Sequence, residues 1–407
     1  MWTATDGGWA GRSIGLGVWI CVFLWIGCAS PEETENIPLG LIVEQDTVDG
    51  PSVVRAVQLA VDQFNAAGGL EVDGERRSVV LHVEDPMGKP EEAARVALRL
   101  INQAGVVALV GPVRSVNAIP VAEVADKAHI PMVSPGSTHV STTLDKPFAF
   151  RVNYTDPVQG VGLARFARET LDASTAAVIF DQSNVYSRDL AQVFRTAFEQ
   201  GGGELGVFAG YVNDEWTDAL EPIQRYGPDI LFLPDFDPTD LPVIAQRARD
   251  VGVTATFLGS DSWPYKEYSR VEVFDGAYQS VPWHWSASNP RTVEFLEAYQ
   301  RAWDGDSPDQ ISPVLAYDAI GVILEALRRA GRPDPDAVRE ALATLEDYPG
   351  VTGPITFRGT DGDPTVQGVI LTLENGQARF VQRLPVAGSD SKPGAVGRRH
   401  AGDRYVR

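Results

Sequence analysis

The feature that most constrains this chain is a regular alternation of short apolar strands and amphipathic helices from Ile37 onward. Apolar residues that recur every three or four positions indicate helices, and short apolar runs between them indicate buried strands. Strands that are joined through helices form parallel sheets covered on both faces. Two such series in tandem predict an α/β protein with two similar lobes. The first series comprises 39–43, 52–67, 79–84, 90–104, 106–110, 119–127 and 132–133, and the second comprises 176–180, 187–201, 205–211, 217–225, 230–233, 241–251 and 256–258.

Polar loops directly follow several of the predicted strands. Ligands of open α/β sheets bind beyond the carboxyl ends of the strands, so these loops are candidates for a binding site. One of them contains Pro135-Gly136-Ser137-Thr138, and two interpretations fit it: a plain turn, or backbone amides and hydroxyls presented to a small anion. Other loops in the same position are 111–115, 181–187, 234–237 and 259–263.

Charge and motif content restrict the classes of function. The chain carries 34 Lys and Arg against 55 Asp and Glu, a formal net charge of −21, which would repel the phosphate backbone of a nucleic acid. None of the 5 histidines has the spacing of a metal-binding motif, and the body contains neither a G-x-S-x-G elbow nor a P-loop. The sequence therefore predicts a protein that is not an enzyme, with no cofactor, no metal site and no nucleic-acid partner.

The N-terminal segment has the features of an export signal. Residues 14–27 are almost uninterruptedly apolar, but the run is shorter than the ~20 residues that a membrane-spanning helix needs. It ends at Gly27-Cys28, which resembles bacterial lipoprotein signals whose cysteine is lipidated and becomes the mature N-terminus. An ordinary cleaved signal and an uncleaved anchor are the alternatives. We predict a lipoprotein signal peptide at 1–28, lipidation of Cys28, a polar tether at 29–36 and a disordered tail at 386–407.

Six stretches of the chain occur in a characteristic order: NAAGGL, EDP, ALVGPVRSVNAIPVAEVADKAHIPMVSPGST, AFRVNYTDPVQG, AAVIFDQSNVYSRDLA and ATFLGSDSW. This ordered set resembles the leucine/isoleucine/valine-binding type of periplasmic solute-binding protein, the receptor component of ABC importers, over about residues 37–380. The resemblance implies the type I binding-protein fold. That fold has two doubly wound lobes, three hinge crossings and a ligand cleft that closes between the lobes.

The resemblance also implies how the chain is divided between the lobes. Two helices predicted after Pro282, at 290–303 and 313–330, would complete the layers of lobe 1. An alternating apolar and polar stretch at 353–380 would join the sheet of lobe 2. The expected division is 37–151 with 283–348 for lobe 1, and 152–282 with 349–385 for lobe 2.

Site residues are carried over from the family by position. The α-carboxylate of the ligand would be held by Ser115, by the backbone around Ser137 and by the Thr138 hydroxyl. Neutral donors beside a glycine suit a carboxylate, because they supply several hydrogen bonds without burying a second charge. Paired with Ser115, the stretch 135–138 is therefore interpreted as an anion site rather than as a turn alone.

The opposite end of the ligand would meet lobe 2. Asp261 matches an acidic residue that holds the ammonium group, with a helix N-cap as the alternative role. Tyr186 matches an aromatic residue that closes over the ligand, with ordinary packing as the alternative, and Phe236 lies close to another aromatic position.

Three departures from the family concern specificity. Asp49 stands where relatives often have a large aromatic residue, and Trp263 and Tyr265 add bulk beside Asp261, so the pocket is not expected to suit a branched aliphatic group. Residues 283–285, Trp-His-Trp, are expected to pack at a hinge crossing rather than to contact the ligand.

The predicted function is that of an extracytoplasmic substrate-binding lipoprotein of an ABC importer. Its ligand would be an amino acid or a close relative such as an amide, and its partners would be the permease subunits and, through the lipid anchor, the membrane. The alternative is a ligand-sensing receptor of the same fold that docks on a regulatory partner or envelope enzyme.

Overall fold

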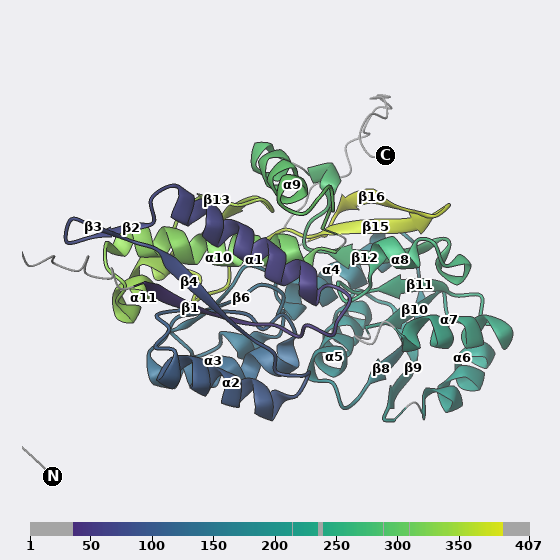
Figure 1. The fold of residues 1–407 in the computed structure, drawn as a ribbon. Helices are drawn as coiled ribbons and strands as arrows, with labels where there is room; N and C mark the ends of the chain where they lie inside the picture. Colours follow the sequence, from purple (N-terminus) through teal and green to yellow (C-terminus); the bar gives the residue numbers. More distant parts are fainter. Residues whose placement is uncertain (1–35, 214, 235–238, 288, 309, 386–407) are drawn as a thin grey trace, which may run out of the picture. The chain divides into compact units, whose positions relative to one another are not determined.

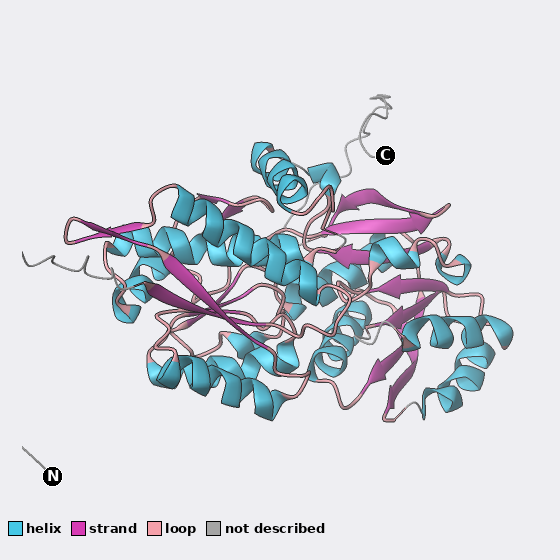
Figure 2. Cartoon of the chain, viewed as in Figure 1, coloured by secondary structure: helices cyan, strands magenta, loops and turns pink. Residues whose placement is uncertain are grey.

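The computed structural model describes residues 36–385 except 214, 235–238, 288 and 309 (Figure 1). The predicted signal peptide with Cys28, the tether up to residue 35, Phe236 and the C-terminal tail lie outside these described residues. Helices and strands alternate along most of the described chain (Figure 2). Within the described ranges, no helix combines the length and the apolar character that crossing a membrane requires.

The first sheet is parallel throughout and has the order β4-β1-β5-β6-β7. Helices α1 and α10 cover one face, and α2 and α3 cover the other (Figure 1). Because both faces of the inner strands β1, β5 and β6 are buried, these strands are mostly apolar, as the sequence pattern predicts. The elements are β1 (Ile37–Ile42), α1 (Gly50–Ala66), β4 (Val79–Glu84), α2 (Pro90–Gln103), β5 (Leu109–Val110), α3 (Ser115–Ala128), β6 (Met132–Ser134), β7 (Ala149–Arg151) and α10 (Ser312–Ala330).

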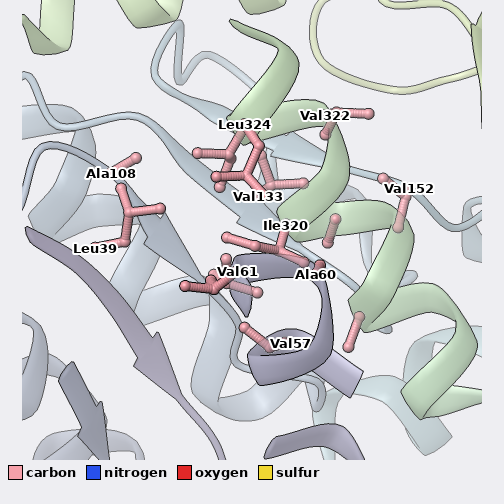
Figure 3. Close-up of a cluster of buried hydrophobic side chains, with 14 of the residues drawn as sticks. Leu39, Val57, Ala60, Val61, Ala108, Val133, Val152, Ile320, Val322 and Leu324 are labelled. Carbon is pink, nitrogen blue, oxygen red and sulfur yellow. The ribbon is translucent and has the colours of Figure 1, made fainter. Parts of the chain in front are cut away.

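Helical spacing accounts for the core on one face of this sheet. Val57 and Val61 of α1 are one turn apart and point toward the strands, where they meet Leu39 of β1 and Ile320 of α10 (Figure 3). The helix can begin at Gly50 because Pro51 occupies the first turn, where a missing amide breaks no helical hydrogen bond.

The second sheet has the order β16-β15-β12-β11-β10-β8-β9. Strands from β9 to β12 are parallel, whereas β15 and β16 add antiparallel strands at one edge. Helices α4 and α5 pack on one face, and α6, α7 and α8 on the other. The elements are α4 (Asp156–Glu169), β8 (Thr175–Asp181), α5 (Val185–Gln200), β9 (Glu204–Tyr211), α6 (Leu220–Tyr226), β10 (Ile230–Leu233), α7 (Asp240–Asp250), β11 (Thr256–Gly259), α8 (Tyr265–Tyr268), β12 (Ala277–Val281), β15 (Val369–Glu374) and β16 (Gln377–Arg383).

Late segments of the chain pack against both sheets. Helices α9, α10 and α11 contribute to the core of the first sheet, and β15 and β16 extend the second. Val351, Ile355 and Phe357 also belong to the core of the first sheet. We therefore propose the two-lobe division predicted from the sequence with one change. Lobe 1 continues past residue 348 to beyond residue 357, and the last segment of lobe 2 begins after it instead of at 349. The remaining elements are β2 (Leu70–Val72), β3 (Glu75–Arg77), α9 (Pro290–Ala302), α11 (Pro335–Ala343), β13 (Tyr348–Pro349) and β14 (Pro354–Ile355).

Three chain segments lie side by side between the two sheets. A Cβ atom on Gly368 would be 2.6 Å from Cε1 of Tyr154 and 3.0 Å from the carbonyl oxygen of Val281. These residues come from the stretch after β7, the end of β12 and the stretch before β15. The number and proximity of these segments agree with the three hinge crossings of the predicted fold class.

Two helices differ from the sequence pattern. Helix α3 begins at Ser115, four residues before the predicted start at 119, so Ser115 lies at its N-terminus. The pattern does not predict α4, because small residues replace apolar ones on its buried face. A Cβ on Gly160 would be 2.6 Å from Cγ1 of Val193, and one on Gly162 would be 2.4 Å from Cγ of Leu384. Close packing selects glycine there and hides the helical period.

Candidate ligand-binding site

Ser115, Ser137 and Thr138 lie together where β5 and β6 end. The Ser137 hydroxyl donates to Ser115 Oγ at 3.0 Å. The backbone amides of Thr138 and His139 also donate to Ser115 Oγ, each at 3.3 Å. Ser115, Ser137 and Thr138 are all more than nine-tenths buried. The fold thus brings together residues that the sequence places on two separate loops, although their role toward a ligand stays a prediction.

Neighbouring groups fix the position of the Ser137 loop. Arg151 donates from one terminal nitrogen to the Ser137 carbonyl at 2.9 Å, and Asn153 Nδ2 donates to the Gly136 carbonyl at 2.9 Å. A Cβ on Gly136 would lie 2.5 Å from Cγ1 of Val113, so only glycine allows the two loops to approach this closely. This stretch is therefore more than a surface turn: buried side chains hold its backbone in place.

Asp261 follows β11 and is surrounded by neutral donors. Its Oδ1 accepts from the Tyr186 hydroxyl and from Gln159 Nε2, both at 2.6 Å, and its Oδ2 accepts from Asn153 Nδ2 at 3.3 Å. Asp261 is partly accessible, yet burial of the carboxylate raises its pKa, and the three donors only partly oppose that shift. The alternative N-cap role is not observed, because the N-cap residue of α8 is Pro264.

Asp156 is a site candidate that the sequence pattern missed. It is the first residue of α4, it is 2% exposed, and its amide donates to the Thr138 carbonyl at 2.8 Å. Among the described residues, neither carboxylate oxygen has a hydrogen-bond partner of normal geometry. Burial raises the pKa of Asp156 to about 7, while the nearby Thr138 side chain and the Arg151 charge lower it and Asp261 raises it further. In the sequence, Thr155-Asp156-Pro157 has the pattern of an ordinary helix start, which conceals this environment.

Tyr186 and Asp261 line a cavity of ≈ 100 Å³, and most of its other lining residues belong to segments next to the first sheet. Tyr186 is 3% exposed and also packs in the core beside α4 and α5, so both of its predicted roles are compatible with its position. Ser115, Ser137 and Thr138 do not line this cavity. Its remaining wall is formed by Thr47, Val48, Asp49, Val113, Arg114, Ser262, Trp263, Pro264, Gln310, Ile311 and Ser312.

The aromatic residues near the site are mostly held in cores. The Trp263 indole donates to the Leu233 carbonyl at 3.0 Å, and Tyr265 is 3% exposed in the same core. Trp283 is 2% exposed and packs against Trp285 with their ring centres 4.6 Å apart. These contacts agree with the expectation of packing for residues 283–285. Within the described residues, no group of His, Cys, Asp and Glu side chains could hold a metal ion.

Two α/β lobes with opposed polar groups at the strand ends and a cavity lined from both sides define a two-lobed ligand-binding protein. Residues 44–378 match the sequence profile of the periplasmic binding protein family, and the chain belongs to that family. Its members are extracytoplasmic binding proteins and not enzymes. The predictions of the family, the fold class and a non-enzymatic role are thereby confirmed.

Individual relatives are similar over most of the chain. The leucine-, isoleucine-, valine-, threonine- and alanine-binding protein of Pseudomonas aeruginosa is 26% identical over 70% of this chain and 75% of its own. An amino acid binding protein from the same organism is 29% identical over 78% of this chain and 81% of its own. The crystal structure of a leucine-binding protein from Thermotoga maritima superposes with a TM-score of 0.78, at 27% identity, over 86% of this chain and 98% of that one.

Proposed function

We propose that this protein is the substrate-binding component of an ABC importer and that its ligand is a free amino acid or a close relative. The observation that carries the ligand class is that Asp156 lies beside Thr138, whose amide donates to Ser115 Oγ, and is within reach of the charge of Asp261. The described hydrogen bonds to Asp261 come from neutral groups, and Asp156 accepts none of normal geometry from described residues. The binding of amino acids named for the Pseudomonas relatives supports this proposal.

Both charged groups of an α-amino acid find complementary groups here. Its carboxylate would accept from the Ser115 hydroxyl and the Thr138 amide, replacing hydrogen bonds that now end on Ser115 Oγ. Its ammonium group would donate to Asp156 and Asp261 and so place a cation in direct contact with both carboxylates. Tyr186 and Phe236 would cover the ligand from lobe 2 as the lobes close.

A thermal-shift panel tests the ligand class. Amino acids should raise the melting temperature, because a ligand that binds only the folded state adds about 2.7 kcal/mol at a hundredfold excess over Kd. Their decarboxylated amines, their amides, sugars and inorganic anions should leave it unchanged, because each lacks at least one of the two charged groups. Ser115→Ala and Thr138→Ala should each reduce the shift, since a hydrogen bond to a charged group is worth about 1.5–3 kcal/mol. A full shift from an amine or an amide alone would contradict the two-ended site.

Binding should release a proton near neutral pH. With its pKa at about 7, Asp156 is partly protonated in the free protein, and an adjacent ammonium group would favour the ionised form. Affinity should therefore rise as the pH increases toward about 7 and level off above it. Because the pKa is raised in the folded state, the free protein should lose stability from about pH 4 to about pH 7, and the bound protein should lose less.

Calorimetric titrations in two buffers with different ionisation enthalpies measure the proton release directly. The observed binding enthalpy should depend on the buffer for the natural protein and not for Asp156→Asn. A binding enthalpy that is independent of the buffer at pH 7 would exclude Asp156 from contact with the ammonium group.

We further propose that Cys28 carries a lipid anchor, on the basis of the short apolar run that ends at Gly27-Cys28. Cys28→Ser should move the protein from the membrane fraction to the soluble fraction. Cys21→Ser is the matched control, since Cys21 is the only other cysteine and lies inside the same apolar run. Retention of Cys28→Ser on membranes would favour an uncleaved anchor instead. Genes for a permease and an ATPase beside the gene for this protein would support the importer role.

A further inference from the structure

The wall of the cavity that lobe 1 contributes combines charged and polar side chains with three aliphatic ones, Val48, Val113 and Ile311. Thr47 and Asp49 precede α1, Arg114 precedes α3, Gln310 precedes α10, and Ser312 is the first residue of α10. A side chain that extends from an amino acid bound at Asp261 would meet this wall, because both line the same ≈ 100 Å³ cavity. The chemistry of the wall therefore decides which side chain is accepted.

Asp49 can accept hydrogen bonds from a ligand. It immediately precedes α1 but makes no side-chain cap to that helix, and it accepts from the Thr47 hydroxyl at 3.0 Å. An ionised carboxylate offers about four acceptor positions and no donor, so further positions are available. Asp49 is neither fully buried nor fully exposed, as a residue at the rim of a cavity should be.

Arg114 lines the same cavity and offers hydrogen-bond donors where Asp49 offers acceptors. Both Arg114 and Asp49 act on Glu44, a 4% exposed carboxylate that is hydrogen-bonded to Asn117. The pKa of Glu44 is raised mainly by burial, and the Arg114 charge lowers it while the Asp49 charge raises it. Both residues line the same cavity and act on the same carboxylate: Arg114 offers only donors, and Asp49, when ionised, offers only acceptors.

From this pairing we infer that the ligand is an amino acid with a neutral side chain that both donates and accepts hydrogen bonds, such as a carboxamide or a hydroxyl. When the lobes close, a branched aliphatic side chain would displace the water that hydrates Asp49 and Arg114. It could replace none of the hydrogen bonds that this water made. A side chain with a full charge would be attracted by one of the two residues and repelled by the other. This inference rests on the proposed function and specifies the ligand class of the same site.

Pairs of amino acids with nearly the same shape provide the test. Calorimetry or thermal shift should show asparagine bound more tightly than leucine, and threonine more tightly than valine, by about tenfold or more. Equal or tighter binding of leucine and valine would overturn the inference while leaving the proposed function intact. Tighter binding of aspartate or lysine than of asparagine would also overturn it. Binding of no amino acid at all would contradict the proposed function itself.

A variant of Asp49 tests whether the lobe 1 wall of the cavity causes the preference for asparagine over leucine. Asp49→Ala should reduce the ratio of asparagine to leucine affinity by about tenfold. Asp46→Ala, an exposed residue of the same loop that does not line the cavity, should leave the ratio unchanged. A ratio that is unaffected by Asp49→Ala would overturn the assignment. The comparison of asparagine with leucine in the natural protein decides the ligand class even if the variant does not fold.

Discussion

Replacing Asp261 with alanine should weaken ligand binding roughly several hundredfold or more. The ammonium group of the ligand is desolvated as the lobes close, and it would then lose one of its two carboxylate partners. Removing one member of a desolvated charge pair costs about 3–5 kcal/mol. Folding should survive, because Asp261 is partly accessible and its described hydrogen-bond donors are neutral side chains.

Calorimetric titration with the best ligand from the panel measures this loss. Asp172→Asn is the matched control: Asp172 is exposed, it lies in lobe 2, and its positive φ of 53° is one that asparagine tolerates. The control should bind like the natural protein. An Asp261→Ala protein with unchanged affinity would show that Asp261 organises Tyr186 and Gln159 without contacting the ligand.

Replacing Asp363 with alanine should lower the free energy of unfolding by about 3–5 kcal/mol. Arg151 is fully buried, and its Nε donates to Asp363 Oδ1 at 2.6 Å. Burial lowers the pKa of Arg151, and Asp363 opposes that shift, which indicates that the carboxylate stabilises the buried cation. Without Asp363 the guanidinium would keep hydrogen bonds to Thr143 and to the Ser137 carbonyl but would lose its hydrogen-bonded carboxylate, and only the more distant effect of the Asp156 charge would remain.

Urea unfolding followed by circular dichroism measures this effect. Asp306→Ala removes the partner of Arg55 in an exposed ion pair and should change the free energy of unfolding by less than about 1 kcal/mol. Equal effects of the two substitutions would contradict the structural role of the pair between buried Arg151 and partly exposed Asp363. Because Arg151 also holds the Ser137 loop, Asp363→Ala should weaken ligand binding as well.

The positions of most strands and helices were predictable because both faces of each sheet are buried. Strands inside such a sheet become short apolar runs, and each helix that covers it buries one face and so carries an apolar stripe, as in α1, where Val53, Val57 and Val61 recur at one turn. Helix α4 was not predictable in this way, since Gly160 and Gly162 are required by contacts with Val193 and Leu384. Those partners are distant in sequence, so no local pattern reveals them.

Part of the candidate site was also visible in the sequence. Ser115, Ser137 and Thr138 follow strands of one parallel sheet, and the carboxyl ends of such strands lie at the same edge. Their roles as carboxylate donors stay predictions, as do the roles of Tyr186 and Asp261. Phe236 and Cys28 lie outside the described residues, so their predicted roles rest on the sequence alone.

By itself, the sequence determined the α/β class, the tandem arrangement of the two series and the loops that could bind a ligand. These properties depend on local periodicity and on the position of polar residues after strands. Only the tertiary structure decided that Asp156, which has the sequence context of an ordinary helix start, is buried beside Thr138 with a pKa of about 7. It also decided that Gln159, Tyr186 and Asn153 converge on Asp261, and that Asp49 and Arg114 share one wall of the cavity. The burial and the electrostatic environment of a residue depend on all of its neighbours, which come from distant parts of the chain. Both are therefore set only when the lobes have folded and packed together.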